Sequence, residues 1–406
     1  MLTCDKGRLV RLIPEDEEGS DVEKSAIKAL FNYRLAPSPD TARSEWLDIV
    51  EARHSLWVGI SSEKRELIRS FLNTINLEIV KRARPSSVFN FQSASVGNLF
   101  LTGARLFTGS FESAIYLLGA ITGVPEHISV IPAINSNFSH HICAGLEDGT
   151  RIVGQNAISH PSLPTTIPSA SESQTPGLDG NQLSHELDRV EDANLPGSLP
   201  TLRKQYIAFQ KDLIEDLPSR IDRIWYINPY GQEIRPTPNS KVIDKINSAQ
   251  CVIYSIGSLY TSIIPCLVLK DVGEAIANPD IRFKILILNG SLDRETGPST
   301  NPFDAKDFVA AIADACAYSR SANAHSDEKG WKQFVTHVVH LEGDGTPRVE
   351  RAVLKELGIE TIRIYGRRNA AGSMIYDGKA LTQTLEAIMV RRDPRGEQSR
   401  RNTLHS

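Results

Sequence analysis

The 406-residue chain combines 40% hydrophobic with 23% charged residues, which is typical of a globular protein with one large domain or two to three smaller ones. Its 45 Lys and Arg and 49 Asp and Glu give a net charge of −4, which argues against nucleic acid as the main partner. No apolar run approaches the roughly 18 residues of a membrane span, and no secretory h-region opens the chain. We therefore expect a cytoplasmic protein with no membrane partner.

Neither cysteine nor histidine spacing predicts a metal centre. The five cysteines are widely separated and include no Cys-x-x-Cys pair, so neither a disulfide framework nor a zinc site is expected. His140 and His141 are neighbours in a predicted hairpin strand, where successive side chains point to opposite faces. Histidines elsewhere show no ligand spacing, and we assign no metal-binding residue.

Helices are the main elements predicted for the first 125 residues. Residues 1–60 are polar with weak helical patterning, whereas apolar residues recur every three to four positions over 62–83. That helix should end before Pro85, because the residue before a proline avoids the α conformation. Two more helices are predicted, one from about Val96 and one after Ser110, which is a suitable N-cap.

Two short strands and a hairpin are predicted in the same half of the chain. The strands cover 86–92 and 128–134. The hairpin covers 140–159, since Asp148 and Gly149 suit the positive-φ positions of a type I′ turn.

Two segments are predicted to lie outside the folded core. Residues 159–200 are dominated by Ser, Pro, Thr and Gly and contain few large apolar residues, so they predict a disordered insertion. The basic, polar tail 391–406 predicts a disordered end.

Short apolar strands alternate with longer helices from residue 221 onward. This alternation predicts a Rossmann-like, doubly wound α/β fold with a mostly parallel sheet sandwiched by helices, and with the hairpin inserted. We expect a single domain over 1–390. The predicted strands are 221–229, 251–256, 282–290, 334–342 and 359–365, and the predicted helices are 240–249, 261–276, 304–319, 349–358 and 378–389.

Small polar residues follow three of the predicted strands. In open α/β sheets, ligands bind outside the carboxyl ends of the strands. Glycine allows close backbone approach, and helix N-termini with hydroxyl side chains suit phosphate. The candidate phosphate- or nucleotide-binding residues are Asn90, Ser95, Gly97 and Asn98 in the first segment, Gly257, Ser258, Tyr260, Thr261 and Ser262 in the second, and Asn289 and Arg294 in the third.

A purely structural explanation of these residues stays open. Ser and Thr at strand-to-helix turns often act only as helix caps. No G-x-G-x-x-G follows a predicted strand and no Walker P-loop is present, which disfavours conventional NAD and P-loop ATP chemistry.

Several segments resemble the CofD-like family, which includes the 2-phospho-L-lactate transferases and the YvcK-type bacterial gluconeogenesis factors. The sequence GSLYTSIIPCLVLKDVGEAI at 257–276 closely resembles the family's G-S-L-Y-T-S loop and helix. The hairpin sequence LEDGTRIVGQNAI and the turn sequence ILILNGSLDRET also match in the family's order. The resemblance is strongest over 85–320, apart from the insertion.

The chain also departs from the family pattern. Family members begin with a strand and a glycine-rich turn, followed by an acidic segment. This sequence begins with what looks like the region just after them. A truncated or a diverged member would both explain this difference. Ala94 stands where many members have histidine, and Ser255 and Ile256 replace a Gly-Pro pair. Catalytic residues are therefore left unassigned.

The resemblance implies three alternatives. The first is a transferase of a phospholactyl-type group from a nucleoside diphosphate donor, with Mg²⁺ as cofactor. Tyr260 would then stack on the base or ribose, and Asn289 and Arg294 would act electrostatically. The second is a non-catalytic nucleotide-sugar-binding metabolic regulator, and the third a truncated chain that binds nothing tightly. The implied partner is a small nucleotide-type molecule, and a homodimer stays open.

Overall fold

Two main hydrophobic cores divide the chain into a helical bundle and an α/β part. The computed structural model describes residues 22–83, 89–136, 140–160, 216–322, 324–369 and 372–390, together with residues 10, 12, 138 and 199. We predicted one domain over 1–390, and this stays a prediction. The described residues bury most of their apolar side chains in these two clusters, and two smaller clusters hold the rest. Most of the predicted insertion and all of the tail lie outside the described residues. None of the described helices has the length and apolar character needed to cross a membrane.

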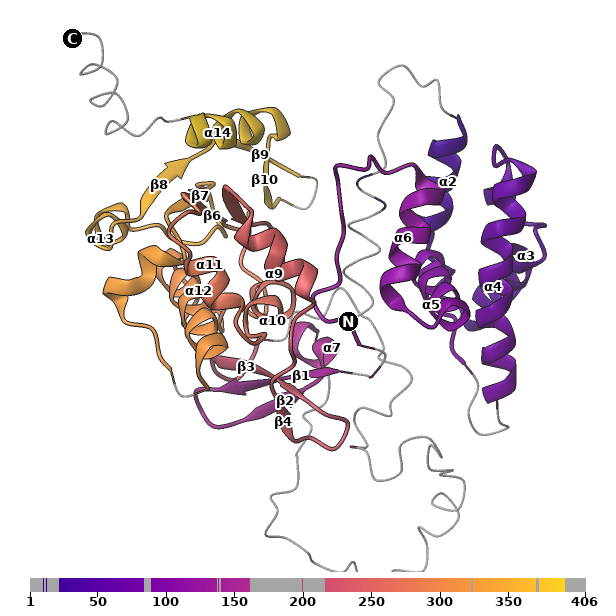
Figure 1. The fold of residues 1–406 in the computed structure, drawn as a ribbon, viewed down its shortest axis with the longest axis horizontal. Coiled ribbons are helices and arrows are strands. Elements are labelled where there is room, and N and C mark those ends of the chain that lie inside the picture. Colours follow the sequence, from indigo (N-terminus) through magenta and orange to yellow (C-terminus); the bar gives the residue numbers. More distant parts are fainter. Residues whose placement is uncertain are drawn as a thin grey trace, which may run out of the picture.

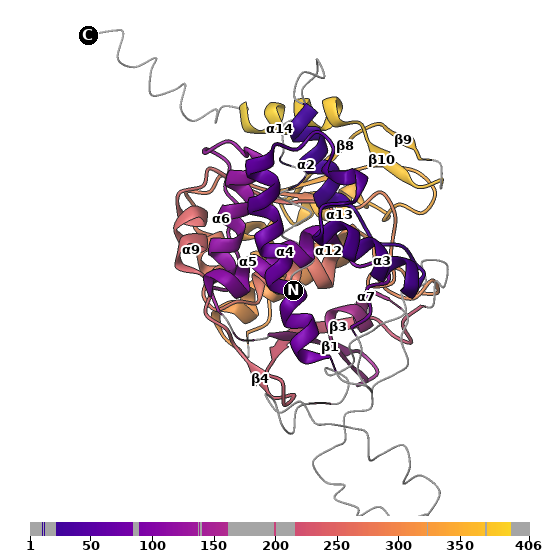
Figure 2. The same ribbon diagram turned by 90° about the vertical axis from the view of Figure 1, so that its right-hand side faces the viewer.

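The helical bundle contains α2 to α6, and Figures 1 and 2 show it as a unit beside the α/β part. Its helices are α2 (Val22–Asn32), α3 (Pro39–Val50), α4 (Ser62–Arg82), α5 (Val96–Thr108) and α6 (Phe111–Thr122), with a 3₁₀ turn η1 (Ser55–Trp57) after α3. The helices predicted at 62–83, from Val96 and after Ser110 are confirmed. Ser95 and Ser110 accept hydrogen bonds as N-caps of α5 and α6. The strands predicted at 86–92 and 128–134 are wrong for the residues described, which form no strand.

The antiparallel sheet forms the lower layer of the α/β part. Its strands lie in the order β2-β1-β3-β4. They are β1 (His141–Leu146), β2 (Arg151–Val153), β3 (Ile221–Ile227) and β4 (Glu233–Ile234), and the short helix α7 (Gln155–Ser159) follows β2. The predicted hairpin is confirmed over β1 and β2, with the Asp148 carboxylate accepting the N–H of Thr150. Its type I′ turn is wrong, because Gly149 has φ 85° but Asp148 is not at positive φ, and residues 155–159 form α7. The strand predicted at 221–229 is also present, but it pairs antiparallel with β1.

The parallel sheet has the strand order β5-β6-β7-β8 and confirms the α/β prediction. Its strands are β5 (Cys251–Tyr254), β6 (Phe283–Ile287), β7 (His337–His340) and β8 (Glu360–Arg363). The surrounding helices are α9 (Ser240–Asn247), η3 (Leu259–Ile263), α10 (Ile264–Leu267), α11 (Val272–Ala277), α12 (Ala305–Arg320), η4 (Glu328–Gln333), α13 (Arg351–Glu356) and α14 (Gly378–Val390). A small hairpin of β9 (Gly366–Arg368) and β10 (Met374–Tyr376), which the sequence did not predict, follows β8.

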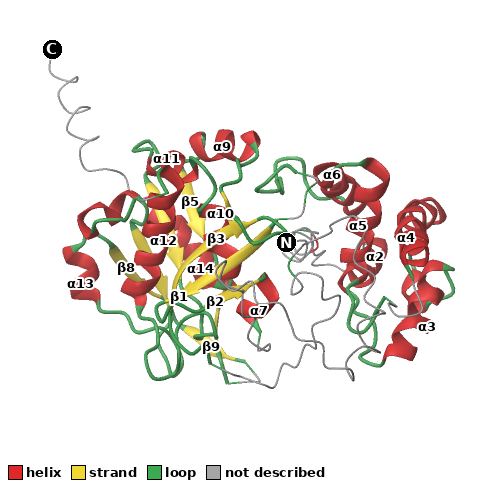
Figure 3. Ribbon diagram, turned by 90° about the horizontal axis from the view of Figure 1, so that it is seen from below, coloured by secondary structure: helices red, strands yellow, loops and turns green. Residues whose placement is uncertain are grey.

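Four layers stack in the α/β part, as Figure 1 shows. On one face of the parallel sheet, Ile388 of α14 packs in the same cluster as Ile285. The other face, which includes Leu286, packs against α10 to α12. Beyond these helices lies the antiparallel sheet, where the hydroxyl of Tyr226 donates to the carbonyl of Pro265 at 2.9 Å. Figure 3 shows the strands between helices of the α/β part, with the wholly helical bundle to one side.

A polar contact joins the helical bundle to the α/β part. Glu112 of α6, only 7% exposed, accepts hydrogen bonds from the Lys241 ammonium at 2.6 Å and the Asn239 amide at 3.3 Å. Tyr116 also donates its hydroxyl to Glu112. The hydrogen bond from Lys241, followed by that from Tyr116, lowers the pKa of Glu112, so the carboxylate is charged at neutral pH. The start of α9 is thereby tied to α6.

Gly103→Ala should destabilise the bundle. A Cβ at Gly103 would lie 2.0 Å from the backbone carbonyl oxygen of Phe71, and α4 cannot move one carbonyl without shifting the helix. We expect a loss of about 1–3 kcal/mol or more in the free energy of unfolding, measured by urea denaturation. Gly119→Ala is the matched control, because a Cβ at Gly119 in α6 meets no atom within 4 Å. It should stabilise the protein by up to about 1 kcal/mol. Equal effects of the two substitutions would contradict the close packing of α4 on α5.

Candidate functional site at the carboxyl edge of the parallel sheet

The segments that follow β5 and β6 form two adjacent loops at the carboxyl edge of the parallel sheet. Because Tyr254 pairs with Leu286 in parallel register, loops 255–258 and 288–296 leave the sheet side by side. Asn289 joins them. Its Oδ1 accepts the N–H of Gly257, and its Nδ2 donates to the Gly257 carbonyl, both at 3.1 Å. This pair of hydrogen bonds fixes the separation of the two loops.

A buried carboxylate holds the start of the π-helix η3. Glu295 is 1% exposed, and its Oε2 accepts the backbone N–H groups of Tyr260 and Thr261 at 2.9 Å. Its Oε1 accepts the hydroxyl of Thr261 at 2.5 Å. The first N–H groups of a helix lack intrahelical partners and attract anions. At η3, the protein's own carboxylate takes the place that a bound anion would occupy.

A second carboxyl group, Asp293, completes the contact between the loops. It accepts the backbone N–H of Glu295 at 3.0 Å, and it bonds the side chains of Thr296 and Ser258. Burial raises the pKa of Asp293. Burial, and next the charge of Asp293, raises the pKa of Glu295 to about 7. Near neutral pH, the Glu295 carboxyl group is therefore protonated in a substantial fraction of molecules.

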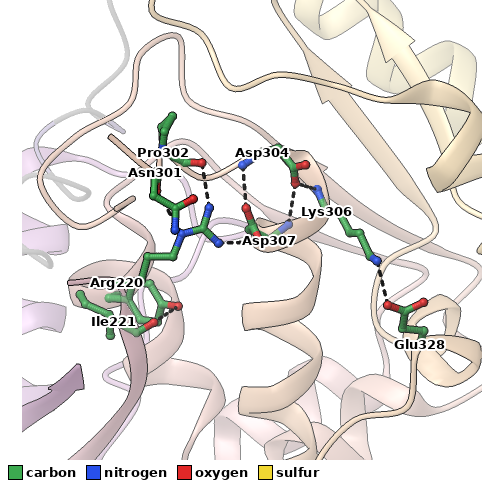
Figure 4. Close-up of polar contacts among 9 residues, drawn as sticks. Arg220, Ile221, Asn301, Pro302, Asp304, Lys306, Asp307 and Glu328 are labelled. Carbon is green, nitrogen blue, oxygen red and sulfur yellow. Dashed lines mark hydrogen bonds and ion pairs between the residues drawn. The ribbon is translucent and has the colours of Figure 1, made fainter. Parts of the chain in front are cut away.

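Arg220 anchors the far end of the second loop to α12, as Figure 4 shows. Its guanidinium donates to the carbonyls of Asn301 and Pro302 at 3.0 and 2.9 Å and to the Asp307 carboxylate at 3.1 Å. Asp307 in turn forms a capping box with Asp304 at the start of α12. Asn289 is therefore attached to Gly257 at one end of residues 289–303, and Arg220 holds Asn301 and Pro302 at the other end. These contacts limit the movement of the segment.

Three backbone N–H groups at this edge have no hydrogen-bond partner within the described part of the chain. They belong to Ser258, Gly290 and Ser291, all of which are partly exposed. Ser258 lies on the loop after β5, and Gly290 and Ser291 lie on the adjacent loop after β6. Backbone N–H groups on neighbouring turns make concave anion-binding sites. These donors, and not the N-terminus of η3, are available to an external anion.

The first group of sequence-predicted site residues lies elsewhere, in the helical bundle. Ser95 caps α5 by accepting the N–H of Asn98, and the Asn90 side chain bonds that of Gln92. Gly97 is buried in α5, and the Oδ1 of Asn98 is enclosed without a partner among the described residues. No hydrogen bond between described residues joins this group to the loops after β5 and β6. The premise that these residues follow a strand also fails for the part of the chain that the structure describes, where no strand precedes α5.

The predicted site residues after β5 and those after β6 lie on adjacent loops. Two of their side chains, those of Tyr260 and Thr261, are buried and bond other parts of the protein. Gly257 is hydrogen-bonded to Asn289, and Ser258 follows it in the chain. The Tyr260 ring is 4% exposed, and its hydroxyl donates to the Ile221 carbonyl at 3.0 Å, so the expectation that it stacks on a nucleotide base is corrected. Thr261 is likewise buried against Glu295.

Ser262 and Arg294 remain at the margin of the site. Ser262 is partly buried on η3. Arg294 is partly buried, and its charge lowers the pKa of both His160 and Asp216, although burial is the main cause for His160 and the Ser299 hydrogen bond for Asp216. The positive charge of Arg294 therefore lies close to His160, which follows α7, and to Asp216.

The sequence patterns did not predict the role of the Asp293 and Glu295 carboxyl groups, nor the hairpin β9–β10 that borders the site. The acidic residues of the turn after β6 were visible in the motif LNGSLDRET, but nothing local predicts their burial. The hairpin lies over the sheet edge, where the hydroxyl of Tyr376 donates to the carbonyls of Leu288 at 2.8 Å and Val339 at 3.2 Å. Its strands are only three residues each, too short for a clear alternation.

The described residues do not fit a protein-held Mg²⁺ ion. Mg²⁺ needs carboxylate and water oxygens in octahedral geometry. Within the described residues, no group of three His, Cys, Asp or Glu side chains could hold a metal ion. The nearest carboxylates, Asp293 and Glu295, turn their oxygens toward backbone N–H groups and hydroxyls.

The chain belongs to the CofD family. The family model described as 2-phospho-L-lactate transferase CofD matches residues 6–363. A Saccharomyces cerevisiae protein, described as uncharacterized protein YNL011C, is 36% identical over 378 residues, covering 88% of this chain and 82% of the yeast protein. The family resemblance inferred from the motifs is thereby confirmed.

Solved structures of a UPF0052-family protein from Bacillus halodurans resemble the chain more distantly. One crystal structure has a TM-score of 0.48 and 18% identity, covering 79% of this chain and 81% of its own. A second has a TM-score of 0.49 and 16% identity, covering 90% and 96%.

Glu295→Gln should flatten the dependence of stability on pH. In the unfolded chain this carboxyl group ionises near 4.5, whereas in the folded protein it keeps its proton to about pH 7. Folding therefore binds a proton between these values, and stability falls as pH rises from about 4.5 to about 7, by an amount on the order of a few kcal/mol. Glutamine mimics the protonated form, since its oxygen accepts the two N–H groups and its nitrogen donates to Thr261.

Urea unfolding at a series of pH values measures this effect. The wild-type protein should lose more stability across the window than the Glu295→Gln variant, with Asp293 contributing a remaining slope of the same sign. Parallel curves for the two proteins would show that Glu295 ionises normally in the folded state.

Proposed function

We propose that the chain binds the phosphate groups of a small nucleotide-type ligand at the carboxyl edge of the parallel sheet. One observation carries the proposal: the N–H groups of Ser258, Gly290 and Ser291, which have no partner among the described residues, lie on adjacent loops at this edge. Membership of the CofD family supports the same ligand class. In this proposal the chain acts as a transferase of a phospholactyl-type group from a nucleoside diphosphate donor.

The loops would offer these donors in a fixed arrangement. Asn289 bonds the backbone of Gly257, Glu295 bonds the start of η3, and Asp293 bonds the side chain of Ser258. Little ordering is then left to be done when an anion binds, which favours affinity. Hydrogen bonds from amides to a charged phosphate contribute about 1.5–3 kcal/mol each. The raised pKa values of both carboxyl groups also reduce their repulsion of the anion.

A transferase would use this site mainly for positioning and electrostatic stabilisation. Phosphoryl-group chemistry needs few covalent steps from the protein when donors are aimed at the charge that develops.

One observation favours the alternative, a non-catalytic binder of nucleotide sugars that regulates metabolism. The carboxyl groups at the site, Asp293 and Glu295, are occupied by hydrogen bonds that hold the loops. Neither group is placed as a general base. Phosphorus NMR of the protein with Mg²⁺, a nucleoside diphosphate-linked ligand and an acceptor alcohol separates the two functions. A transferase moves the phosphorus-linked group to the acceptor hydroxyl and releases the nucleoside monophosphate, whereas a regulator leaves the ligand unchanged.

Ser258→Pro should weaken phosphate binding, whereas Ser258→Ala should preserve it. Ser258 has φ −58°, close to the value of about −65° that proline requires, so the backbone conformation suits proline, which lacks the N–H. Both variants lose the hydroxyl that bonds Asp293, and the comparison therefore isolates the amide. We expect about a tenfold or greater loss of affinity for inorganic phosphate, GDP or UDP in the proline variant.

Calorimetry and thermal shift provide the measurement. A ligand at a hundredfold excess over its Kd should stabilise the wild-type protein by about 2.7 kcal/mol. Equal binding by the proline and alanine variants would show that the Ser258 amide is not a donor to the ligand. A folded wild-type protein that binds phosphate, GDP, UDP and UDP-sugars no better than buffer would overturn the proposed function.

A further inference from the structure

The hairpin β9–β10 forms a second wall beside the proposed phosphate site. A Cβ added at Gly290 would lie 1.8 Å from the carbonyl oxygen of Met374, so the backbones of Gly290 and β10 are in direct contact. The Met374 side chain also packs within about 3 Å of the place where a Cβ of Gly343 would be, in the turn after β7. The hairpin therefore borders one of the three free N–H groups.

Arg368 lies on the face of the hairpin that is turned toward the sheet. It pairs directly with Met374 across the hairpin, and the two side chains share a face. Directly opposite residues have Cβ atoms about 4.5–5.5 Å apart. Because the Met374 carbonyl touches Gly290, the strand pair that carries Arg368 borders Gly290 directly. Arg367 points to the opposite face, where Ile375 is its partner.

The present partners of Arg368 are exposed and exchangeable. Its Nη2 bonds the Asp344 carboxylate at 2.9 Å, with the two side chains 52% and 96% exposed. Its Nη1 bonds the Gly372 carbonyl at 3.1 Å. Exposed ion pairs of this kind contribute about 0–1 kcal/mol, so a phosphate can compete with Asp344 for the guanidinium.

Asp344 itself lies next to the loop that carries Ser291. The adjacent Gly345 accepts the backbone N–H of Leu292 at 2.9 Å. The ion pair of Arg368 and Asp344 is therefore placed at the outer side of the free amides. A cation in this position suits a second phosphate that extends away from the first.

We propose that Arg368 selects ligands with a diphosphate over those with a single phosphate. The amides of Ser258, Gly290 and Ser291 hold one phosphate, and the Arg368 guanidinium leaves Asp344 to hold the next. This inference rests on the proposed function, because it assigns the diphosphate class of ligand to the same site. In this proposal Arg368 binds the ligand and determines its specificity. Asp344 competes with the second phosphate for the Arg368 guanidinium.

Isothermal titration of the full-length protein with pyrophosphate and with inorganic phosphate tests the inference. Arg368→Ala should weaken pyrophosphate binding about tenfold or more, and phosphate binding less than about twofold. Asp344→Asn should tighten pyrophosphate binding, because it frees the guanidinium. Arg367→Ala is the matched control, since it removes the same charge from the other face of the hairpin and should leave both affinities unchanged. Circular dichroism and thermal unfolding of each variant check that the hairpin change leaves the fold intact.

The outcomes separate this inference from the proposed function. If wild type binds pyrophosphate and Arg368→Ala binds it equally well, Arg368 has no role in selection and the phosphate site itself stands. If Arg367→Ala and Arg368→Ala cause equal losses, the effect is one of general charge, and the assignment to Arg368 is wrong. If folded wild-type protein binds neither phosphate nor pyrophosphate, the proposed function fails and this inference fails with it.

Discussion

The carboxyl group of Glu295, buried against the start of η3, is the interaction on which the arrangement of the site depends. It satisfies two backbone N–H groups and one hydroxyl that belong to a segment 34 or 35 residues away. An unsatisfied buried N–H costs free energy comparable to a lost hydrogen bond. The carboxyl group thus removes a cost that the π-helix would otherwise carry, and it fixes η3 against the loop after β6.

This internal carboxyl group also changes where a ligand can bind. A helix N-terminus is a ready anion site only while its N–H groups are free. In this protein those of Tyr260 and Thr261 are taken, and the free donors lie a few residues earlier, at Ser258, and across the gap on the β6 loop. Asn289 keeps the two loops in contact. The same hydroxyl-rich sequence therefore uses Tyr260 and Thr261 in the fold, whereas the backbone N–H of Ser258 has no partner among the described residues.

The two hydrophobic cores separate the helical bundle from the α/β part. The contacts described for the candidate site all lie within the α/β part. The bundle is tied to the start of α9 by Glu112, a mostly buried carboxylate that keeps its charge through Lys241 and Tyr116. The residues at the start of α5 belong to the bundle, and the loops after β5 and β6 belong to the α/β part. The carboxyl edge of the parallel sheet is bordered by the short hairpin β9–β10, which contributes a cation that local sequence patterns did not single out.

The sequence by itself determined the class of structure, most of its elements and the family. Apolar periodicity predicted α4 and the strands of the parallel sheet, Ser95 and Ser110 marked helix starts, and Asp148-Gly149 marked a turn, because each depends on neighbours a few positions away. Only the tertiary structure decided which polar groups of GSLYTS face inward, that Tyr260 is enclosed, and that Asn90 to Asn98 lie apart from the sheet edge. A hydroxyl can cap a helix, bond a buried carboxylate or meet a ligand. The choice depends on a partner dozens of residues away, which local pattern does not specify.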